Sequence, residues 1–499
     1  MWMKWVAVLL VAAFLGGCQT PGSGRPQPAT LAIENVTVID PETRRVLPRH
    51  SIYLAGDRIL AVVPAAERHA YSADTVVDGT GKFLIPGLFD MHVHLFLPEP
   101  ATPTLNLLLA NGVTGIREMS SDCWEIAGVR SGCIAEYTAL QARIRSGEVP
   151  GPDLVSLTST MVMGPTSLRV PEGVDPFIAP RTPEEGRRLA RYLKTRDVDR
   201  IKTHDSIPMD AFYALIDEAR SLGLEVSGHV PFGAGSLEAA RRGYGSIEHA
   251  RDLLYDCSDY GAEFRRQGSD FASRKPGSTK PSNLTRLSRT VAEHDPQICA
   301  PFLGELARTG VYYVPTHVTR EMEARAGEAG YREDPRRKYV MPARNRNWEA
   351  DLAETAALPA DEIDALRRFF LHGLEITGLA HRAGMPVMAG TDANDTMILP
   401  GFSLHKELSL LARAGLEPWD VLRAATTVPA AYLGKSGLYG GISAGKQADL
   451  VLLTANPLDD IGNASAIDSV IASGRRYDRM KLDSLLLEVE RMASEGRSP

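Results

Sequence analysis

The sequence FDMHVHL, from Phe89 to Leu95, places two histidines one residue apart in an otherwise apolar stretch. Because successive side chains of a β-strand point to opposite faces, His92 and His94 would share one face of a strand. Two imidazoles on one face are either hydrogen-bonded core residues or ligands of one metal ion. The stretch therefore predicts a metal site only if neighbouring strands supply further ligands.

After this stretch, apolar strand patterns alternate with amphipathic helix patterns. Such repeated units predict an α/β fold with a parallel sheet, either a closed (β/α)8 barrel or an open doubly wound sheet. No glycine-rich phosphate loop follows the first strand, which argues against the nucleotide-binding form of the open sheet. We therefore expect a (β/α)8 TIM barrel over residues 86–437. Helices are expected at 103–112, 210–223 and 235–244, and strands at 113–119, 224–230, 245–250, 311–317 and 385–393.

Both ends of the chain carry short alternating strand patterns between Gly, Asp and Pro residues. They predict a small β-sandwich built from residues 31–85 and 438–480. A terminal helix or tail is expected at 481–499. An insertion at about 251–299 is polar, which indicates irregular structure, and it forms either a lid over the substrate or a surface elaboration.

The N-terminus has the pattern of a targeting segment. Lys4 precedes the apolar run VAVLLVAAFL, which is too short to span a bilayer comfortably. The following LGGC resembles a bacterial lipobox, which implies a signal peptide at 1–17 and lipidation of Cys18; secretion without a lipid is the alternative. Residues 18–30, rich in Gly and Pro, would form a flexible tether. We expect a lipid-anchored protein on the periplasmic side of the bacterial cell envelope, in the outer membrane if the cell is Gram-negative.

Composition narrows the class of partner. The net charge of −7, without basic clusters, argues against nucleic acid. Beside Cys18 there are four cysteines, which in an oxidising compartment allow three pairings or four free thiols. We favour Cys123 with Cys133 and Cys257 with Cys299, because each pair brackets a loop. No Cys-x-x-Cys occurs, so a thiolate zinc site is not expected.

Four later strand patterns also end in side chains that can bind a metal or a charged group. Each residue alone has an ordinary explanation, as a salt-bridged lysine or a core histidine. In a barrel, however, the carboxyl ends of all strands meet at one mouth. Neutral imidazoles and a carboxylate gathered there suit zinc or a similar divalent ion. The residues are Lys202 in DRIKTH, His229 in VSGHVP, His249 in SIEHA and Asp392 in MAGTDA.

Together with FDMHVHL, this series resembles the amidohydrolase superfamily. The resemblance covers nearly the whole mature chain, and its motifs are specific as a set. The most similar subgroup is that of imidazolonepropionases and metal-dependent prolidases. The motifs are GKFLIPGLFDMHVHL, ANGVTGIREM, AGTDA, LLARAGLEPWDVLRAATTVPAAYLG and GLYGGISAGKQADLVLLTANPL.

The resemblance implies a centre with two divalent metal ions, for which Zn²⁺ is the first expectation. His92, His94 and Asp392 would bind the more buried ion, and His229 and His249 would bind the second. Such ions lower the pKa of water, so that hydroxide forms and attacks a carbonyl carbon.

The resemblance also gives single residues chemical roles. Lys202 would be carboxylated by CO2, because a plain ammonium would repel two cations, and the carbamate would bridge both ions. Asp392 would serve as general acid and base. A mononuclear centre in which Lys202 only forms a salt bridge is the alternative. Asp90 could orient a histidine or cap the strand.

Two positions near the expected substrate pocket depart from the family pattern. His317 follows VPT where many relatives have an apolar residue, and Glu118 follows Arg117 where Arg-Asp is more usual. His317 could bind a substrate carboxylate or stabilise the tetrahedral oxyanion, and Arg117 could also bind substrate. A structural role for either side chain is the alternative.

These expectations describe a metal-dependent amidohydrolase. Its favoured substrate is an amide C–N bond in a small peptide, such as a dipeptide, or in an N-acylated amino acid. Hydrolysis of a cyclic amide, lactone or ester at the same centre is the alternative, and a non-catalytic periplasmic binding protein is a third reading. The expected partners are a small substrate, the membrane through Cys18, and further copies of the chain if it forms a homo-oligomer.

Overall fold

The computed structural model describes residues 26–95, 101–123, 125–126, 129–130, 132–165, 178–280 and 282–495. The predicted signal peptide at 1–17 and Cys18 lie outside these residues. The predicted tether at 18–30 is wrong in its last part, because strand β1 (Gln27–Asp40) begins at Gln27 and pairs there with β4 (Tyr71–Asp78). Within the described ranges, no helix combines the length and the apolar character that a membrane crossing requires.

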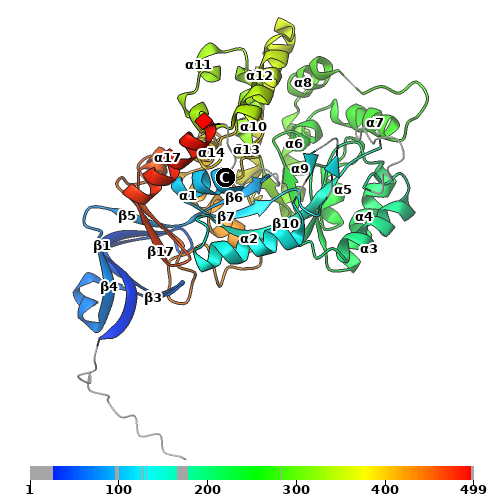
Figure 1. Ribbon diagram of the computed structural model, residues 1–499. Coiled ribbons are helices and arrows are strands. Elements are labelled where there is room, and N and C mark those ends of the chain that lie inside the picture. Colours follow the sequence, from blue (N-terminus) through cyan, green and yellow to red (C-terminus); the bar gives the residue numbers. More distant parts are fainter. Residues whose placement is uncertain are drawn as a thin grey trace, which may run out of the picture.

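A parallel sheet of seven strands forms the centre of the described chain, with helices packed around it (Figure 1). Its strands neighbour one another in the order β14-β13-β12-β11-β10-β7-β6. Their side chains are buried on both faces, as a parallel sheet covered by helices requires. The strands are β6 (Leu88–Val93), β7 (Val113–Glu118), β10 (Asp153–Val162), β11 (Arg200–Thr203), β12 (Glu225–Gly228), β13 (Ser246–Glu248) and β14 (Tyr312–Val314).

Residues 386–393 close the ring between β14 and β6. The amide of Met388 donates to the Tyr313 carbonyl at 2.8 Å, and the amide of Met91 donates to the Ala389 carbonyl at 3.0 Å. An eighth strand was expected here. Among the described residues this segment forms only isolated bridges to β14 and β6, so the barrel is nearly closed but a count of eight strands is not confirmed.

Helices cover the sheet because each presents an apolar face to it. In α4 (Met209–Ser221), Phe212, Leu215 and Ala219 recur at three- and four-residue spacing and are buried in the main hydrophobic core with Val226 of β12. The expected helices are confirmed as α1 (Ala101–Ala110), α4 and α5 (Ser236–Arg241). The others around the barrel are α2 (Ile134–Ser146), α3 (Pro183–Lys194), α10 (His317–Arg325), α11 (Ala329–Arg332), α12 (Pro342–Ala356), α13 (Ala360–Arg382), α14 (Phe402–Arg413), α15 (Pro418–Ala424) and α16 (Thr427–Tyr432).

The two ends of the chain combine in a second, mixed sheet beside the barrel, at the lower left of Figure 1. Its strand order is β17-β16-β15-β5-β1-β2-β3, with β4 paired to β1. Val36 and Ile52 from the first part meet Leu450 and Ile471 from the last in a separate apolar core. Both ends of the chain therefore contribute to one mixed sheet, which is consistent with the predicted β-sandwich. Its remaining strands are β2 (Arg45–Ala55), β3 (Arg58–Pro64), β5 (Phe83–Pro86), β15 (Leu450–Leu453), β16 (Ile467–Ala472) and β17 (Arg475–Asp478), followed by helix α17 (Arg479–Glu495).

The insertion at 251–299 is mostly helical, so the expectation of irregular structure was wrong. Its polar residues pair with one another: Arg265 Nε donates to Asp256 at 2.8 Å, and Arg265 Nη1 donates to Asp252 at 3.2 Å. Charges satisfied inside the segment let it fold as short helices. These are α6 (Asp252–Asp256), α7 (Gly261–Ala272), α8 (Asn283–Ala292) and the start of α9 (Pro296–Thr309).

Two disulfides join the four cysteines that lie within the described residues. Cys123 pairs with Cys133 and Cys257 pairs with Cys299, which confirms the favoured connectivity. The second bridge ties the start of the helical insertion to α9, and both of its cysteines are buried.

Loss of the longer disulfide should destabilise the protein more than loss of the shorter one. The Cys257–Cys299 bridge closes a loop of 42 residues, and the Cys123–Cys133 bridge one of 10. Loop-closure entropy then predicts losses of about 4 and about 3 kcal/mol, respectively, in the free energy of unfolding. Denaturant unfolding of the two double Cys→Ser variants measures both values. A larger loss for the shorter bridge would contradict the prediction.

Candidate metal centre

Three donor atoms meet at the carboxyl end of β6. His94 Nε2 lies 3.2 Å from Asp392 Oδ1, and His92 Nε2 lies 3.4 Å from the same oxygen. All three donors lie within 4.8 Å of one another. Ligands that each reach a zinc ion at roughly 2.0–2.2 Å must be this close together. The arrangement can therefore hold a metal ion.

Asp90 positions the backbone that carries Asp392. Its carboxylate accepts the Thr391 amide at 3.0 Å, the Thr391 hydroxyl at 2.6 Å and the His92 amide at 3.2 Å. Burial raises the pKa of Asp90 to about 7, against the lowering effect of these hydrogen bonds. Asp90 thus ties β6 to the closing segment through backbone groups. The hypothesis that it orients a histidine ring is not supported.

Glu248 at the end of β13 orients the His92 ring instead. His92 Nδ1 lies 2.8 Å from Glu248 Oε2, and Arg117 Nη2 donates to Glu248 Oε1 at 2.7 Å. All three side chains are fully buried. Burial would raise the pKa of Glu248, but Arg117 and the His92 hydrogen bond lower it to about 2. An ionised Glu248 accepts a hydrogen bond from the His92 Nδ1–H, which leaves the lone pair of His92 Nε2 available to a metal ion.

Arg117 is a structural residue beneath the centre. It also donates to the Met91 carbonyl at 2.6 Å and to the hydroxyls of Ser246 and Tyr432, both at 2.9 Å. Because these contacts are all to buried protein groups, they favour the structural alternative for Arg117. The sequence offered one signal for its partner: a carboxylate inside the apolar strand GSIEHA requires a buried cation or donor.

Lys202 of β11 belongs to the same cluster. Its Nζ lies 3.1 Å from His92 Nε2, and only 1% of its surface is exposed. Burial lowers the pKa of Lys202 to about 8, although nearby Glu248 and Asp392 oppose the shift. The lowered pKa enlarges the fraction of Lys202 that is neutral. The neutral amine is the form that reacts with CO2.

His229 and His249 face each other at the ends of β12 and β13. Their ring centroids are 4.5 Å apart, and the His249 ring lies 4.9 Å from that of His92. His249 Nδ1 hydrogen-bonds the Thr316 hydroxyl at 2.7 Å and lies 3.8 Å from Asp392 Oδ2. The structure therefore brings all six predicted ligands into one connected cluster.

A second group of donors adjoins His229. His204, Asp205 and His229 also place ligand atoms within 4.8 Å of one another. Asp205 Oδ1 lies 3.1 Å from His229 Nδ1 and accepts from Arg251 at 2.8 Å. The sequence prediction omitted His204 and Asp205, although they directly follow the strand that ends with Lys202 and Thr203.

Burial favours the neutral form of three of the imidazoles, those of His92, His229 and His249, by lowering their pKa values. It lowers the pKa of His92 to about 4, with help from the Lys202 charge. Burial, reinforced by the charge of Arg251, also holds the pKa of His229 well below the usual value. The pKa of His249 is held well below the usual value by burial and by the neighbouring His229. Neutral imidazoles beside a carboxylate form a donor set that fits a divalent metal ion.

His317 does not face this cluster. It begins α10, is fully buried, and its Nε2 lies 2.9 Å from the Thr377 hydroxyl of α13. Glu407 of α14 accepts the His317 amide at 3.0 Å. Burial, together with Arg320, lowers the pKa of His317 to about 3. These contacts in the helix layer favour the structural alternative for His317.

Buried histidines and a carboxylate at the carboxyl ends of parallel barrel strands are the arrangement expected of a metal-dependent barrel enzyme. The particular family follows from comparison with known proteins: the chain belongs to the Amidohydrolase family, whose model matches residues 201–477. Members of this family are hydrolases that act on C–N bonds.

Solved structures share the fold. A bottromycin amidohydrolase superposes with a TM-score of 0.68 at 22% identity, covering 93% of this chain and 90% of that one. A putative prolidase from Bifidobacterium longum gives 0.59 at 24% identity, covering 93% and 100%. A Xaa-Pro dipeptidase with bound methionine gives 0.60 at 20% identity, covering 90% and 99%.

Curated relatives match over short stretches. An adenine deaminase of Ruegeria pomeroyi is 43% identical over 70 residues, 14% of this chain and 11% of that protein. One of Chelativorans sp. is 38% identical over 73 residues, 15% and 12% of the two chains. The chain therefore spans only about a tenth of the length of these relatives.

Replacing Glu248 by Gln should weaken metal binding about 10- to 100-fold, the usual effect of losing the group that orients a histidine ligand. Zn²⁺ affinity, measured by competition with a coloured chelator, tests this. Glu407→Gln is the matched control, because Glu407 is an equally buried carboxylate that binds only backbone amides of α10. Equal affinities for the two variants would show that Glu248 does not orient His92.

Proposed function

We propose that the protein is a metal-dependent hydrolase that cleaves the amide C–N bond of a small peptide, such as a dipeptide, or of an N-acylated amino acid. The observation that carries the proposal is the single cluster of four histidines, Lys202 and Asp392. Membership of the Amidohydrolase family and the prolidase-like fold neighbours support it.

In this proposal His92, His94 and Asp392 hold one divalent ion, and His229 and His249 hold a second. Lys202, carboxylated by CO2, would supply a carbamate ligand shared by both ions. Zn²⁺ suits this mixture of nitrogen and oxygen donors. When bound, the ions supply Lewis-acid polarisation of a carbonyl and lower the pKa of water.

Asp392 is the proposed proton carrier. Its carboxylate lies beside three imidazoles, and 15% of its side chain is exposed, whereas His92 is fully buried. It can therefore reach both the histidine cluster and an entering substrate. It would take the proton of the attacking water and deliver it to the departing amine, which must leave protonated.

A substrate screen of the purified protein tests the proposal. The panel contains dipeptides including Xaa-Pro, N-acyl amino acids, a cyclic amide, lactones and aryl esters, with Zn²⁺ or Mn²⁺ added. Adenine belongs in it because curated adenine deaminases match part of the chain. We expect turnover of linear amides. Turnover of lactones or esters alone would overturn the amide assignment, and no turnover with no bound metal would favour a binding protein.

Asp392→Asn should lower kcat by about 10²- to 10⁴-fold, the contribution of a general acid and base. His317→Gln should leave kcat and KM nearly unchanged, because His317 contacts α13 rather than the cluster. Steady-state kinetics on the best substrate of the screen measure both. A large rise in KM for the His317 variant would restore its substrate-binding role.

Lys202→Ala should lose metal and activity, and added short carboxylic acids should restore part of both. A small carboxylate can replace the carbamate, whereas a small alkylamine can replace only an unmodified lysine. Metal content and hydrolysis rate, measured with acetate or with ethylamine present, separate the two. Unchanged metal content and rate in Lys202→Ala would refute the carbamate, as would rescue by ethylamine alone.

The proposal places this activity on the periplasmic side of the cell envelope, with the protein held there by a lipid on Cys18. The support is the N-terminal pattern of Lys4, the apolar run and LGGC. Mass spectrometry of the N-terminal peptide from the native host would detect a lipidated Cys18.

A further inference from the structure

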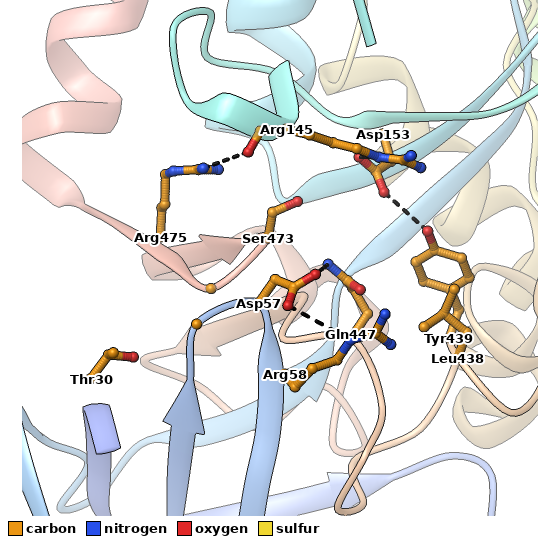
Figure 2. A pocket seen from close by; sticks show the side chains of 12 residues that line it. Thr30, Asp57, Arg58, Arg145, Asp153, Leu438, Tyr439, Gln447, Ser473 and Arg475 are labelled. Carbon is orange, nitrogen blue, oxygen red and sulfur yellow. Dashed lines mark hydrogen bonds and ion pairs between the residues drawn. The ribbon is translucent and has the colours of Figure 1, made fainter. Parts of the chain in front are cut away.

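A cavity lies where the mixed sheet meets the barrel. It has a volume of about 610 Å³, within the usual range for small-ligand sites. Figure 2 shows that Arg145 reaches it from the barrel side and Arg58 from the sheet side, with Tyr439 forming a wall. The cavity therefore depends on both parts of the fold.

Its position separates it from the metal centre. Asp153, which lines the cavity, is the first residue of β10, and Arg145 lies in the last turn of α2, just before that strand. The predicted metal ligands lie at the opposite, carboxyl ends of the barrel strands. Because catalysis in such barrels takes place at the carboxyl ends, a ligand bound in this cavity would not be the reacting substrate.

The acid beneath the cavity is already satisfied by protein groups. The Tyr439 hydroxyl donates to Asp153 Oδ2 at 3.0 Å, and Gln141 Nε2 donates to Asp153 Oδ1 at 2.7 Å. Arg145 Nε lies farther from the same carboxylate, at 3.5 Å. Asp153 therefore uses only part of the hydrogen-bonding capacity of Arg145.

The Arg58 guanidinium is similarly underused. Its Nε lies 3.7 Å from Asp57 Oδ1, and its Nη1 donates to the Gly445 carbonyl at 3.5 Å. Charge-assisted hydrogen bonds are usually about 2.7–2.9 Å long. Arg58 and Arg145 are thus two half-exposed guanidinium groups at one cavity, each held by long contacts.

A third arginine completes the cavity wall. Arg475 Nη2 donates to the Arg145 carbonyl, and its guanidinium lies across Gly147, where a Cβ would be 2.5 Å from Arg475 Nε. Arg475 therefore holds the end of α2 in place, and with it the backbone of Arg145. It adds positive charge without itself needing to contact a ligand.

We propose that this cavity binds a small organic anion. A phosphate or carboxylate group is held between Arg58 and Arg145, whose planar forks match such oxyanions. The remaining volume holds the rest of the molecule against Tyr439, and a hydroxyl or amine of the ligand faces Asp57. The bound anion joins the mixed sheet to the barrel and stabilises their junction.

Isothermal titration calorimetry of the metal-loaded protein, at constant ionic strength, tests the site with glycerol 3-phosphate and with citrate. We expect saturable binding of at least one probe, which identifies the preferred oxyanion. Arg58→Gln and Arg145→Gln should each weaken it about tenfold, the equivalent of one charge-assisted hydrogen bond. The same probe should raise the melting temperature of the wild-type protein.

Arg308→Gln is the charge-matched control, since Arg308 is an exposed arginine in the last turn of α9. It should bind the probe as the wild type does. Absence of saturable binding of both probes would overturn the proposal, as would equal binding by the Arg58→Gln/Arg145→Gln double variant. All variants should retain metal content, so failure here leaves the proposed hydrolase activity untouched.

Discussion

The centre depends on one constraint: the Arg117 guanidinium, the Glu248 carboxylate and the His92 imidazole are buried together and joined by hydrogen bonds. Ions removed from water cost several kcal/mol each unless they are paired and hydrogen-bonded. Arg117 meets this condition through contacts with Glu248, Met91, Ser246 and Tyr432. Glu248 can therefore stay ionised in the barrel interior and fix the His92 ring. The nitrogen that faces the other ligands is thus oriented by the protein fold, before any ion binds.

The closing segment, residues 386–393, determines where Asp392 lies. Gly390 in the closing segment fits between β14 and β6, because a Cβ there would lie 2.5 Å from a Val314 methyl group and 3.1 Å from the His92 amide nitrogen. Two residues later, Asp392 adopts a left-handed conformation with φ of 67°. A regular strand could not hold this conformation. The backbone therefore leaves the extended conformation at Asp392, the residue whose carboxylate lies beside His92 and His94.

Sequence reasoning identified the parts of the structure that have local signals. Strand and helix patterns are local, and each predicted ligand lies near the end of a strand pattern. The barrel and the cluster could therefore both be predicted from the sequence. Glu248 was missed because its partner Arg117 is 131 residues away in the chain. The two alternatives for Arg117 and for His317 could not be separated from the sequence for a related reason: a polar residue near a strand end can face the barrel interior or the helix layer as readily as the mouth.

The mixed sheet adds a constraint on how the chain folds. β1 and β15 belong to opposite ends of the sequence, and β5 pairs with both. Completing the sheet therefore requires contacts of very high sequence separation, which span the whole barrel. A ligand that binds between Arg58 of the sheet and Arg145 of the barrel would bind only the completed structure. By binding only the folded state, the ligand would raise its stability through mass action. It would do so at the end of the barrel opposite the metal centre, which stays free for substrate.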